Sequence, residues 1–312
     1  MAAPADSFWN GAIRGRWLVP RHGSGLDQWL KALPYLIPTL IGMVLFTHGA
    51  VIAAFVISLH RWDILTPPQF LGWDNYKDLF NTPLFWKTMK NTAYYTVVSV
   101  PLGIAVSLFT AMLINQKLKG ITFFRTVFFL PTITSIVAVS LVWFWMYNPD
   151  FGIINWLLGL VDIQGPGWLG STKWAMPAII IFGVWRSFGY NMVIFLAGLQ
   201  GIPDHLYEAA EVDGAGMLRR FWHITAPLVS PTTFFVLIIS IIGSFQVFEQ
   251  TFVLTQGGPA YATLTLAYYI YQQAFQWFQM GLASALAYIL FIMVMIVTVV
   301  QFRVSRGWVH YG

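Results

Sequence analysis

The stretch Glu208-Ala-Ala-Glu-Val-Asp-Gly-Ala-Gly-Met-Leu-Arg-Arg-Phe-Trp-His-Ile-Thr-Ala-Pro227 is a charged segment between two long apolar runs. Pro203 and Asp204 predict a helix start just before it, because proline fits a first helical turn and aspartate suits the positive end of the helix dipole. Gly214 predicts the end of that helix, since glycine tolerates the left-handed backbone found there. A second short helix is expected over 215–223. We therefore expect two short helices that meet at a glycine bend, in an exposed loop suited to docking on another protein.

This segment resembles the cytoplasmic loop, known by its Glu-Ala-Ala start, of permease subunits in ABC importers. The family pattern is Glu-Ala-Ala, three residues, Gly, nine residues, Ile, any residue, Leu-Pro, and Ala226 stands here for the usual leucine. An ordinary connection between membrane helices would not need this spacing. The resemblance implies a coupling helix that sits in a groove of an ATPase subunit. By resemblance, the coupling residues are Glu208, Ala209, Ala210, Asp213, Gly214, Ala215, Ile224 and Pro227.

The composition indicates an integral membrane protein. Of the 312 residues, 57% are hydrophobic and only 9% are charged, whereas a soluble domain carries about 25% charged residues. The net charge of +5 is modest and does not favour a nucleic-acid partner. Cysteine is absent, which excludes disulfides, thiolate metal sites and cysteine nucleophiles.

Apolar runs poor in charge predict six helices, each long enough to cross about 30 Å of hydrocarbon. They are expected at about 33–59, 92–115, 127–147, 174–199, 227–247 and 280–302. Pro131 is expected to kink the third span or to mark its first turns. The predicted fold is therefore an all-α polytopic membrane protein with six transmembrane helices in a permease domain over 32–303, with a cytoplasmic coupling loop over 201–226.

The positions of lysine and arginine predict the orientation. Eleven of the 17 lie in the segments on one side of the six spans, five lie on the other side, and Arg186 lies within a span. Basic residues accumulate on the cytoplasmic side, so both tails, 1–31 and 304–312, and the loop 201–226 are expected inside the cell. The resemblance places the protein in a prokaryotic cell membrane.

Two further stretches narrow the resemblance to the carbohydrate-uptake branch of these permeases: Phe-Leu-Gly-Trp-Asp-Asn-Tyr (70–76) and Phe-Phe-Arg-Thr-Val-Phe-Phe-Leu-Pro (123–131). Such importers pair two related permeases with two ATPase subunits and an external sugar-binding protein. The resemblance thus implies that ATP and Mg bind to the ATPase subunits, and that this chain binds no cofactor.

The chain carries no motif for catalysis. It has no Gly-x-x-x-x-Gly-Lys-Ser/Thr phosphate loop, no His-Glu-x-x-His and no nucleophile elbow, so neither catalytic nor metal-ligating residues are expected. An enzyme is therefore disfavoured, and transport should come from polar contacts along a path.

Polar residues inside a membrane are costly and tend to face the interior of a helix bundle. The expected substrate path comprises Arg186, Ser187, Tyr190 and Asn191 in the fourth span and Gly243, Gln246 and Glu249 at the end of the fifth. Tyr190 and Gln246 offer the aromatic face and the hydrogen-bonding groups that a sugar needs. For Arg186, a substrate contact, a pair with a carboxylate such as Glu249, and bonds to backbone carbonyls all remain open.

The sequence leaves other transporters open as well. An ABC importer for glycerol phosphate or a polyol would keep the coupling loop and change the cargo. An ion-coupled secondary transporter or a channel would need membrane carboxylates, and the predicted spans hold none apart from Glu249 at an edge. A membrane scaffold is a third class.

Overall fold

The computed structural model describes residues 25–116 and 119–309, and the chain divides into two compact units, residues 1–53 and 54–312. Most of the predicted N-terminal tail lies outside the described residues. In the first unit, α1 (Gly25–Gly42) passes directly into a π-helical segment, η1 (Met43–Gly49). α2 (Ala50–Ser58) continues the helix from the first unit into the second. The run Trp29–Ser58 is apolar and long enough to cross a membrane, in the region expected for the first span.

Three helices of the second unit are also long and apolar enough to cross a membrane: α4 (Pro83–Ile114), α8 (Ala175–Gln200) and α15 (Met280–Ser305). α4 begins earlier than its predicted span because Pro83 fits the first helical turn, where the missing N–H has no partner to lose. By length and composition, the described residues hold four such helices, or up to six if each of two bent pairs forms one span. The chain is therefore a helical protein with several candidate membrane spans.

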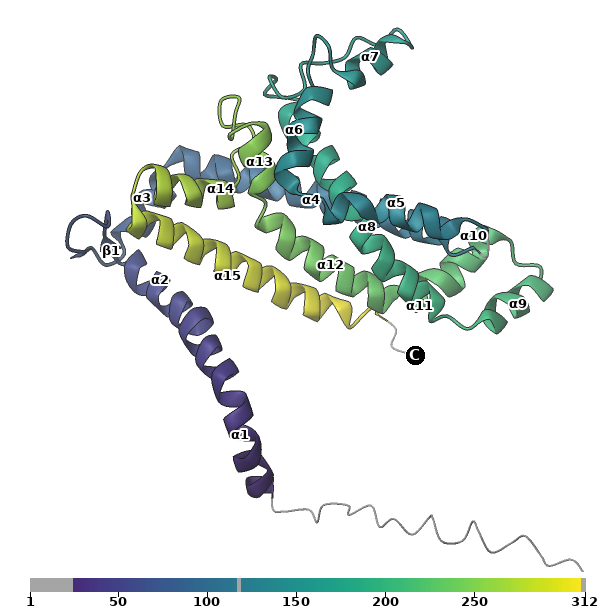
Figure 1. The fold of residues 1–312 in the computed structure, drawn as a ribbon, viewed down its shortest axis with the longest axis horizontal. Helices are drawn as coiled ribbons and strands as arrows, with labels where there is room; N and C mark the ends of the chain where they lie inside the picture. The colour runs from purple at the N-terminus through teal and green to yellow at the C-terminus, as the bar shows by residue number, and fades with distance from the viewer. Residues whose placement is uncertain (1–24, 117–118, 310–312) are drawn as a thin grey trace, which may run out of the picture. The chain divides into compact units, whose positions relative to one another are not determined.

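The region of the predicted third span, 127–147, is not one straight helix. α5 (Ile121–Ile133) ends soon after Pro131, and α6 (Ile136–Met146) restarts at an angle of 99° (Figure 1). The break falls at Thr134, whose backbone is extended with φ −76° and ψ 152°. A proline disturbs the turn that precedes it, and the helix continues through Pro131 to Ile133. The interruption is therefore a full break three residues after the proline and not a kink at the proline itself.

The predicted fifth span, 227–247, is also broken, near its start. Met217–Leu228 and α12 (Ser230–Phe245) meet at 66°. The first arm consists of α10 (Met217–Arg220), η2 (Phe221–Thr225) and α11 (Ala226–Leu228). Between α12 and α15 the helical segments are short: α13 (Glu249–Leu254), α14 (Leu266–Tyr271) and the π-helical η3 (Gln272–Gln276).

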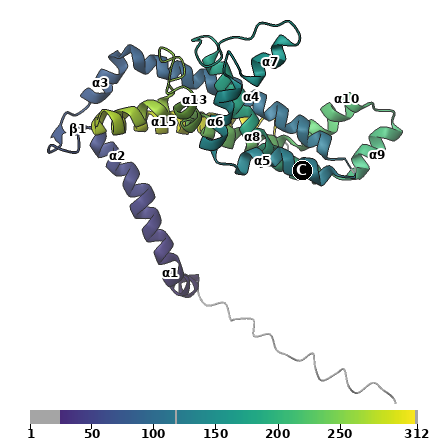
Figure 2. The ribbon, with the colours of Figure 1, turned by 45° about the horizontal axis from the view of Figure 1, so that its top comes forward.

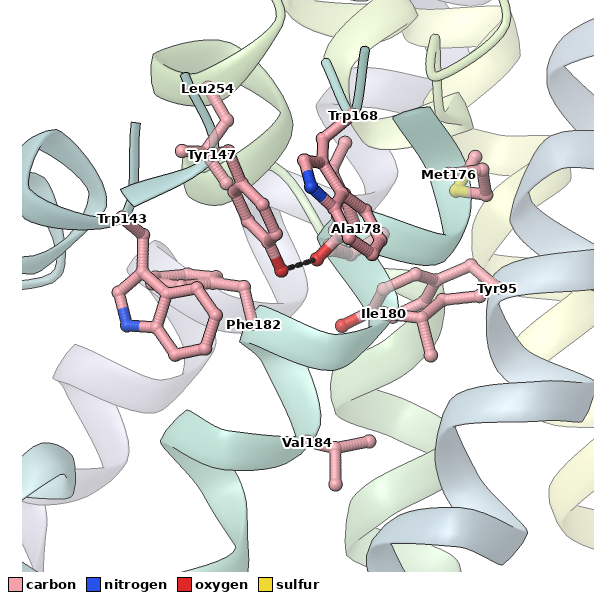
Figure 3. Packing of buried hydrophobic residues seen from close by; sticks show 12 residues of the cluster. Tyr95, Trp143, Tyr147, Trp168, Met176, Ala178, Ile180, Phe182, Val184 and Leu254 are labelled. Carbon is pink, nitrogen blue, oxygen red and sulfur yellow. Dashed lines mark hydrogen bonds between the residues drawn. The ribbon is translucent and has the colours of Figure 1, made fainter. Parts of the chain in front are cut away.

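The second unit is built around α4 and α8, which share its most extensive helix–helix contact, and α5 and α12 pack on this pair (Figures 1 and 2). α5 approaches α8 closely at Gly189, where a Cβ atom would overlap the carbonyl oxygen of Phe128. An aromatic core extends from this scaffold toward α6 (Figure 3). Within it, the Tyr147 hydroxyl donates a 2.8 Å hydrogen bond to the carbonyl oxygen of Ala178 in α8.

A short antiparallel hairpin, β1 (His60–Arg61) with β2 (Gln69–Phe70), follows α2 and leads to α3 (Asp74–Asn81). The buried Asn75 side chain holds this turn, because its Nδ2 donates to the carbonyl oxygens of Ser58 at 2.7 Å and His60 at 2.9 Å. The 70–76 motif thus has a structural task in this region. The remaining helices are α7 (Ile153–Gly159) and α9 (Asp204–Val212).

Candidate functional site

A cavity of about 420 Å³ lies among α4, α8 and α12, beside the break between α5 and α6. α8 contributes four of the residues expected from the sequence, and α12 contributes Gly243. The polar residues and glycines that line the cavity are Tyr95, Ser99, Gly103, Thr132, Gly183, Arg186, Ser187, Tyr190, Asn191, Ser240, Gly243, Ser244 and Gln250.

Arg186 connects the cavity to the break in the neighbouring helix. Its Nη1 donates to the carbonyl oxygens of Pro131 at 2.9 Å and Thr132 at 3.0 Å. These carbonyls lie in the last turn of α5, which has no following turn to bond them. The sequence left three roles open for Arg186, and the structure shows the hydrogen bonds to backbone carbonyls. Part of the Arg186 side chain also lines the cavity.

The other residues expected in the fourth span lie on the same wall. Asn191 is only 6% exposed, and its Nδ2 donates to the Ser240 hydroxyl of α12 at 3.3 Å. Tyr190 is 48% exposed and has its ring at the cavity. Because Ser187 and Asn191, like Arg186 and Tyr190, are four residues apart on α8, one helix presents all four side chains to the cavity.

The residues expected on the path after α12 lie away from this cavity. Gln246 and Glu249 are both exposed and are not among the residues that line the cavity; Gln250 is. α12 ends at Phe245, and the chain turns through non-helical residues before α13 begins. A helical continuation of α12, assumed in the sequence prediction, would have placed these side chains differently. A contact of Gln246 or Glu249 with substrate therefore stays a prediction.

Sequence reasoning also missed the contribution of α4. The Tyr95 hydroxyl accepts a 3.0 Å hydrogen bond from Gln250 Nε2, and the Ser244 hydroxyl donates to Thr96 Oγ1 at 3.0 Å. Tyr95 approaches α8 at Gly183, where a Cβ atom would overlap its hydroxyl. The sequence signal for α4 was a series of hydroxyl residues in the charge-free predicted span 92–115, which fits ordinary helix packing equally well.

The chemistry of this cavity suits an uncharged or anionic polar solute. Among the described residues that line it, Arg186 carries the only charge and no carboxylate is present. Hydroxyl and amide groups can exchange hydrogen bonds with a polyhydroxylated molecule, and aromatic rings can pack on its apolar faces. The described residues contain no group of three or more His, Cys, Asp or Glu side chains arranged for a metal ion.

A second candidate site is the pair of short helices that the sequence predicted. α9 begins after Pro203 and ends at Val212, and Gly214 adopts the left-handed conformation with φ +73°. The amide of Ala215 donates to the carbonyl oxygen of Ala210 at 2.8 Å, which closes the helix end. The expected helix start, helix end and glycine bend are therefore all present.

The segment from α9 to η2 has one exposed side and one side that packs on the neighbouring helices. Glu208, Ala209, Asp213 and Gly214 are exposed, whereas Ile224 packs on the core beneath. Large apolar side chains are exposed around the bend: Val212 at 88%, Met217 at 79%, Leu218 at 72% and Trp222 at 62%. A group of exposed apolar side chains in a loop can serve as an interaction surface.

Two side-chain contacts hold the bend. Glu211 Oε2 accepts a 3.3 Å bond from Arg220 Nη1, and the Tyr207 and Thr225 hydroxyls lie 3.0 Å apart. These contacts join α9 to α10 and η2 across the glycine. Pro227 follows the bend, in α11, which leads directly into α12.

Comparison with known proteins gives a consistent result. A family model described as "binding-protein-dependent transport system inner membrane component" matches residues 101–308. The probable ABC transporter permease protein YesP of Bacillus subtilis (strain 168) is 38% identical over 287 residues, covering 90% of this chain and 92% of that protein. The lactose transport system permease protein LacF of Rhizobium radiobacter is 37% identical over 288 residues, covering 90% and 94%.

A solved structure shares the fold. The bacterial alginate ABC transporter in complex with alginate pentasaccharide-bound periplasmic protein contains a chain that matches with a TM-score of 0.81. The match has 24% sequence identity and covers 92% of this chain and 98% of that chain.

Proposed function

Because the chain belongs to the family of binding-protein-dependent transport system inner membrane components, we propose that it is a permease subunit of an ATP-driven sugar importer. It forms the translocation path together with a second permease. An external binding protein delivers a mono- or oligosaccharide to this path, and two ATPase subunits bind ATP and Mg. The chain crosses a prokaryotic cell membrane several times, with both termini in the cytoplasm.

The observation that carries this proposal is the polar cavity on α8. It combines hydroxyl and amide groups with the rings of Tyr95 and Tyr190, and this combination recognises a polyhydroxylated ligand. An ion-coupled transporter would need carboxylates to bind protons or cations, and the described lining has none. The geometry therefore favours a sugar moved by an external motor.

Coupling to that motor is assigned to the bent segment from α9 to η2. Its exposed apolar side chains around Gly214 fit a groove on an ATPase subunit. When ATP binding closes the ATPase pair, the segment moves with it, and the connected helices convert the motion into alternating access to the cavity. Differences in binding free energy between the two states supply the driving force.

The substrate path is tested by paired variants of two glutamines. Gln250→Ala removes a cavity group and the bond to Tyr95, whereas Gln246→Ala changes an exposed side chain outside the cavity. We expect Gln250→Ala and Tyr190→Ala to reduce sugar-stimulated ATP hydrolysis by the reconstituted importer, and Gln246→Ala to leave it unchanged. Equal activity of all three variants and the wild type would remove this site.

Coupling is tested by two neighbouring glycines. A Cβ atom at Gly214 or Gly216 meets nothing within 4 Å, but only Gly214 has a positive φ. Gly214→Ala should therefore strain the bend by about 1–2 kcal/mol, while Gly216→Ala should not. We expect weaker association with the ATPase subunit and slower transport for Gly214→Ala alone. Full association and transport by Gly214→Ala would contradict the coupling role.

A further inference from the structure

A second hollow, of about 390 Å³, lies at one end of the α4–α8 pair. Lys87 and Lys90 line it from α4, and Lys173 lines it from the turn that precedes α8. Asn91 and Tyr94 complete the α4 side of the pocket. Spacings of three, four and seven residues place Lys87, Lys90, Asn91 and Tyr94 on one face of that helix.

This lysine pocket lies on the same two helices as the central cavity. Tyr94 lines the pocket and the adjacent Tyr95 lines the cavity. From Lys90 to Ser99, the first α4 serine in the cavity, the helix rises by about 14 Å. In the orientation of the proposed function, the lysine pocket is on the external side, where a sugar arrives.

The charged residues that line the lysine pocket and the central cavity are all positive. No aspartate or glutamate occurs among the described residues that line the pocket or the cavity. Lys87 Nζ donates to the carbonyl oxygen of Ala260 at 2.6 Å, so that contact does not neutralise the ammonium group. The ion pairs Lys77–Asp74 and Arg220–Glu211 include no lysine of the pocket.

We propose that the lysine pocket is an entry site for a negatively charged sugar, such as one that carries a uronic-acid carboxylate. This inference rests on the proposed function, since it names the class of sugar that the importer takes. Three ammonium groups around one hollow repel one another, and an anion relieves that repulsion. The cation of Arg186, deeper on the same route, extends the preference from the entry to the cavity.

An acidic surface of the external binding protein would also neutralise the lysines. A docked folded domain, however, would not fill a cavity about 14 Å further along the helix. One negatively charged sugar that moves from the pocket to the cavity would meet the three lysines first and then Arg186, so the observations favour the sugar.

The test uses the importer purified with its partner subunits and placed in lipid nanodiscs, without the external binding protein. Binding is measured by saturation-transfer NMR with two matched pairs of disaccharides: cellobiouronic acid with cellobiose, and digalacturonic acid with galactobiose. Members of each pair differ in charge and share their linkage. The variant is Lys87→Gln/Lys90→Gln/Lys173→Gln, and the control is Lys77→Gln, an exposed lysine already paired with Asp74 at 2.8 Å.

We expect at least one acidic sugar to bind more tightly than its neutral partner, with affinity that falls as salt is raised. Each exposed ion pair contributes little by itself, so the triple variant should bind the acidic sugar about tenfold more weakly, and Lys77→Gln should bind it as the wild type does. Binding that does not distinguish charge, including no binding of any probe, overturns the inference. So does a triple variant that loses affinity for the external binding protein while it binds acidic sugars normally.

A different measurement tests the proposed function itself, independently of the preference for charge. The proposed function fails if the complete importer, with its external binding protein, shows no sugar-stimulated ATP hydrolysis. Stimulation by neutral sugars alone would leave the importer assignment intact and refute only the preference for charge.

Discussion

Replacing Arg186 by methionine removes a guanidinium group while keeping a long, flexible side chain in the cavity wall. The two hydrogen bonds from Nη1, at 2.9 and 3.0 Å, would be lost from the last turn of α5. A hydrogen bond that involves a charged group contributes about 1.5–3 kcal/mol. Arg186 is partly exposed, and water in the cavity can reach the released carbonyls, so we reduce the sum of the two bonds by half, to a net loss of about 1.5–3 kcal/mol.

The loss should appear as a lower Tm of the detergent-solubilised importer, by about 2–4 °C per kcal/mol. Arg186→Lys keeps the charge but cannot hold two carbonyls with one planar group, so it should lose about half as much. Ser187→Ala is the control, because it changes the same wall while its hydroxyl bonds only within α8, at 3.4 Å to the Val184 carbonyl oxygen. Its Tm should equal that of the wild type.

Transport measurements on the Arg186 variants distinguish a structural role of the side chain from a role of its positive charge in substrate binding. If Arg186 acts by holding the break between α5 and α6, Arg186→Met and Arg186→Lys should both slow transport, in the order of their Tm values. The reasoning is refuted if Arg186→Met keeps the wild-type Tm. A normal Tm with abolished transport would instead assign the arginine to substrate alone.

Two further predictions concern stability, one through helix packing and one through buried hydrogen bonds. Gly189→Ala should cost about 1–3 kcal/mol, as overpacking does, because the new methyl group would meet the Phe128 carbonyl oxygen of α5; thermal unfolding should show the loss, and Gly243→Ala, where a Cβ meets nothing within 4 Å, should not. Asn75→Ala leaves two carbonyls in the hairpin turn without their donor and should lower stability by about 1–3 kcal/mol. Normal stability of Asn75→Ala would show that water replaces the side chain there.

Features that depend on neighbouring residues could be predicted from the sequence. The helix start at Pro203 and Asp204 and the left-handed Gly214 follow from local backbone preferences, and the structure has both. The apolar runs likewise predict where long helices form. The break after Pro131 was foreseen as a kink, but its angle of 99° depends on the helices packed around it.

Features that join distant parts of the chain could not be predicted in this way. The sequence offered three roles for Arg186, and only the packing of α5 on α8 brings the Pro131 and Thr132 carbonyls within hydrogen-bond distance. Gln250 lines the cavity in place of Gln246 because the chain leaves the helical path after Phe245.

The sequence by itself determined the class of the molecule and the form of its docking segment, because hydrophobic length, charge distribution and glycine geometry act over a few turns of chain. The tertiary structure decided which polar groups share the cavity and that Lys87, Lys90 and Lys173 surround one pocket. The physical reason is that these groups come from helices far apart in sequence. Helix breaks and close glycine contacts then set the distances across which side chains interact.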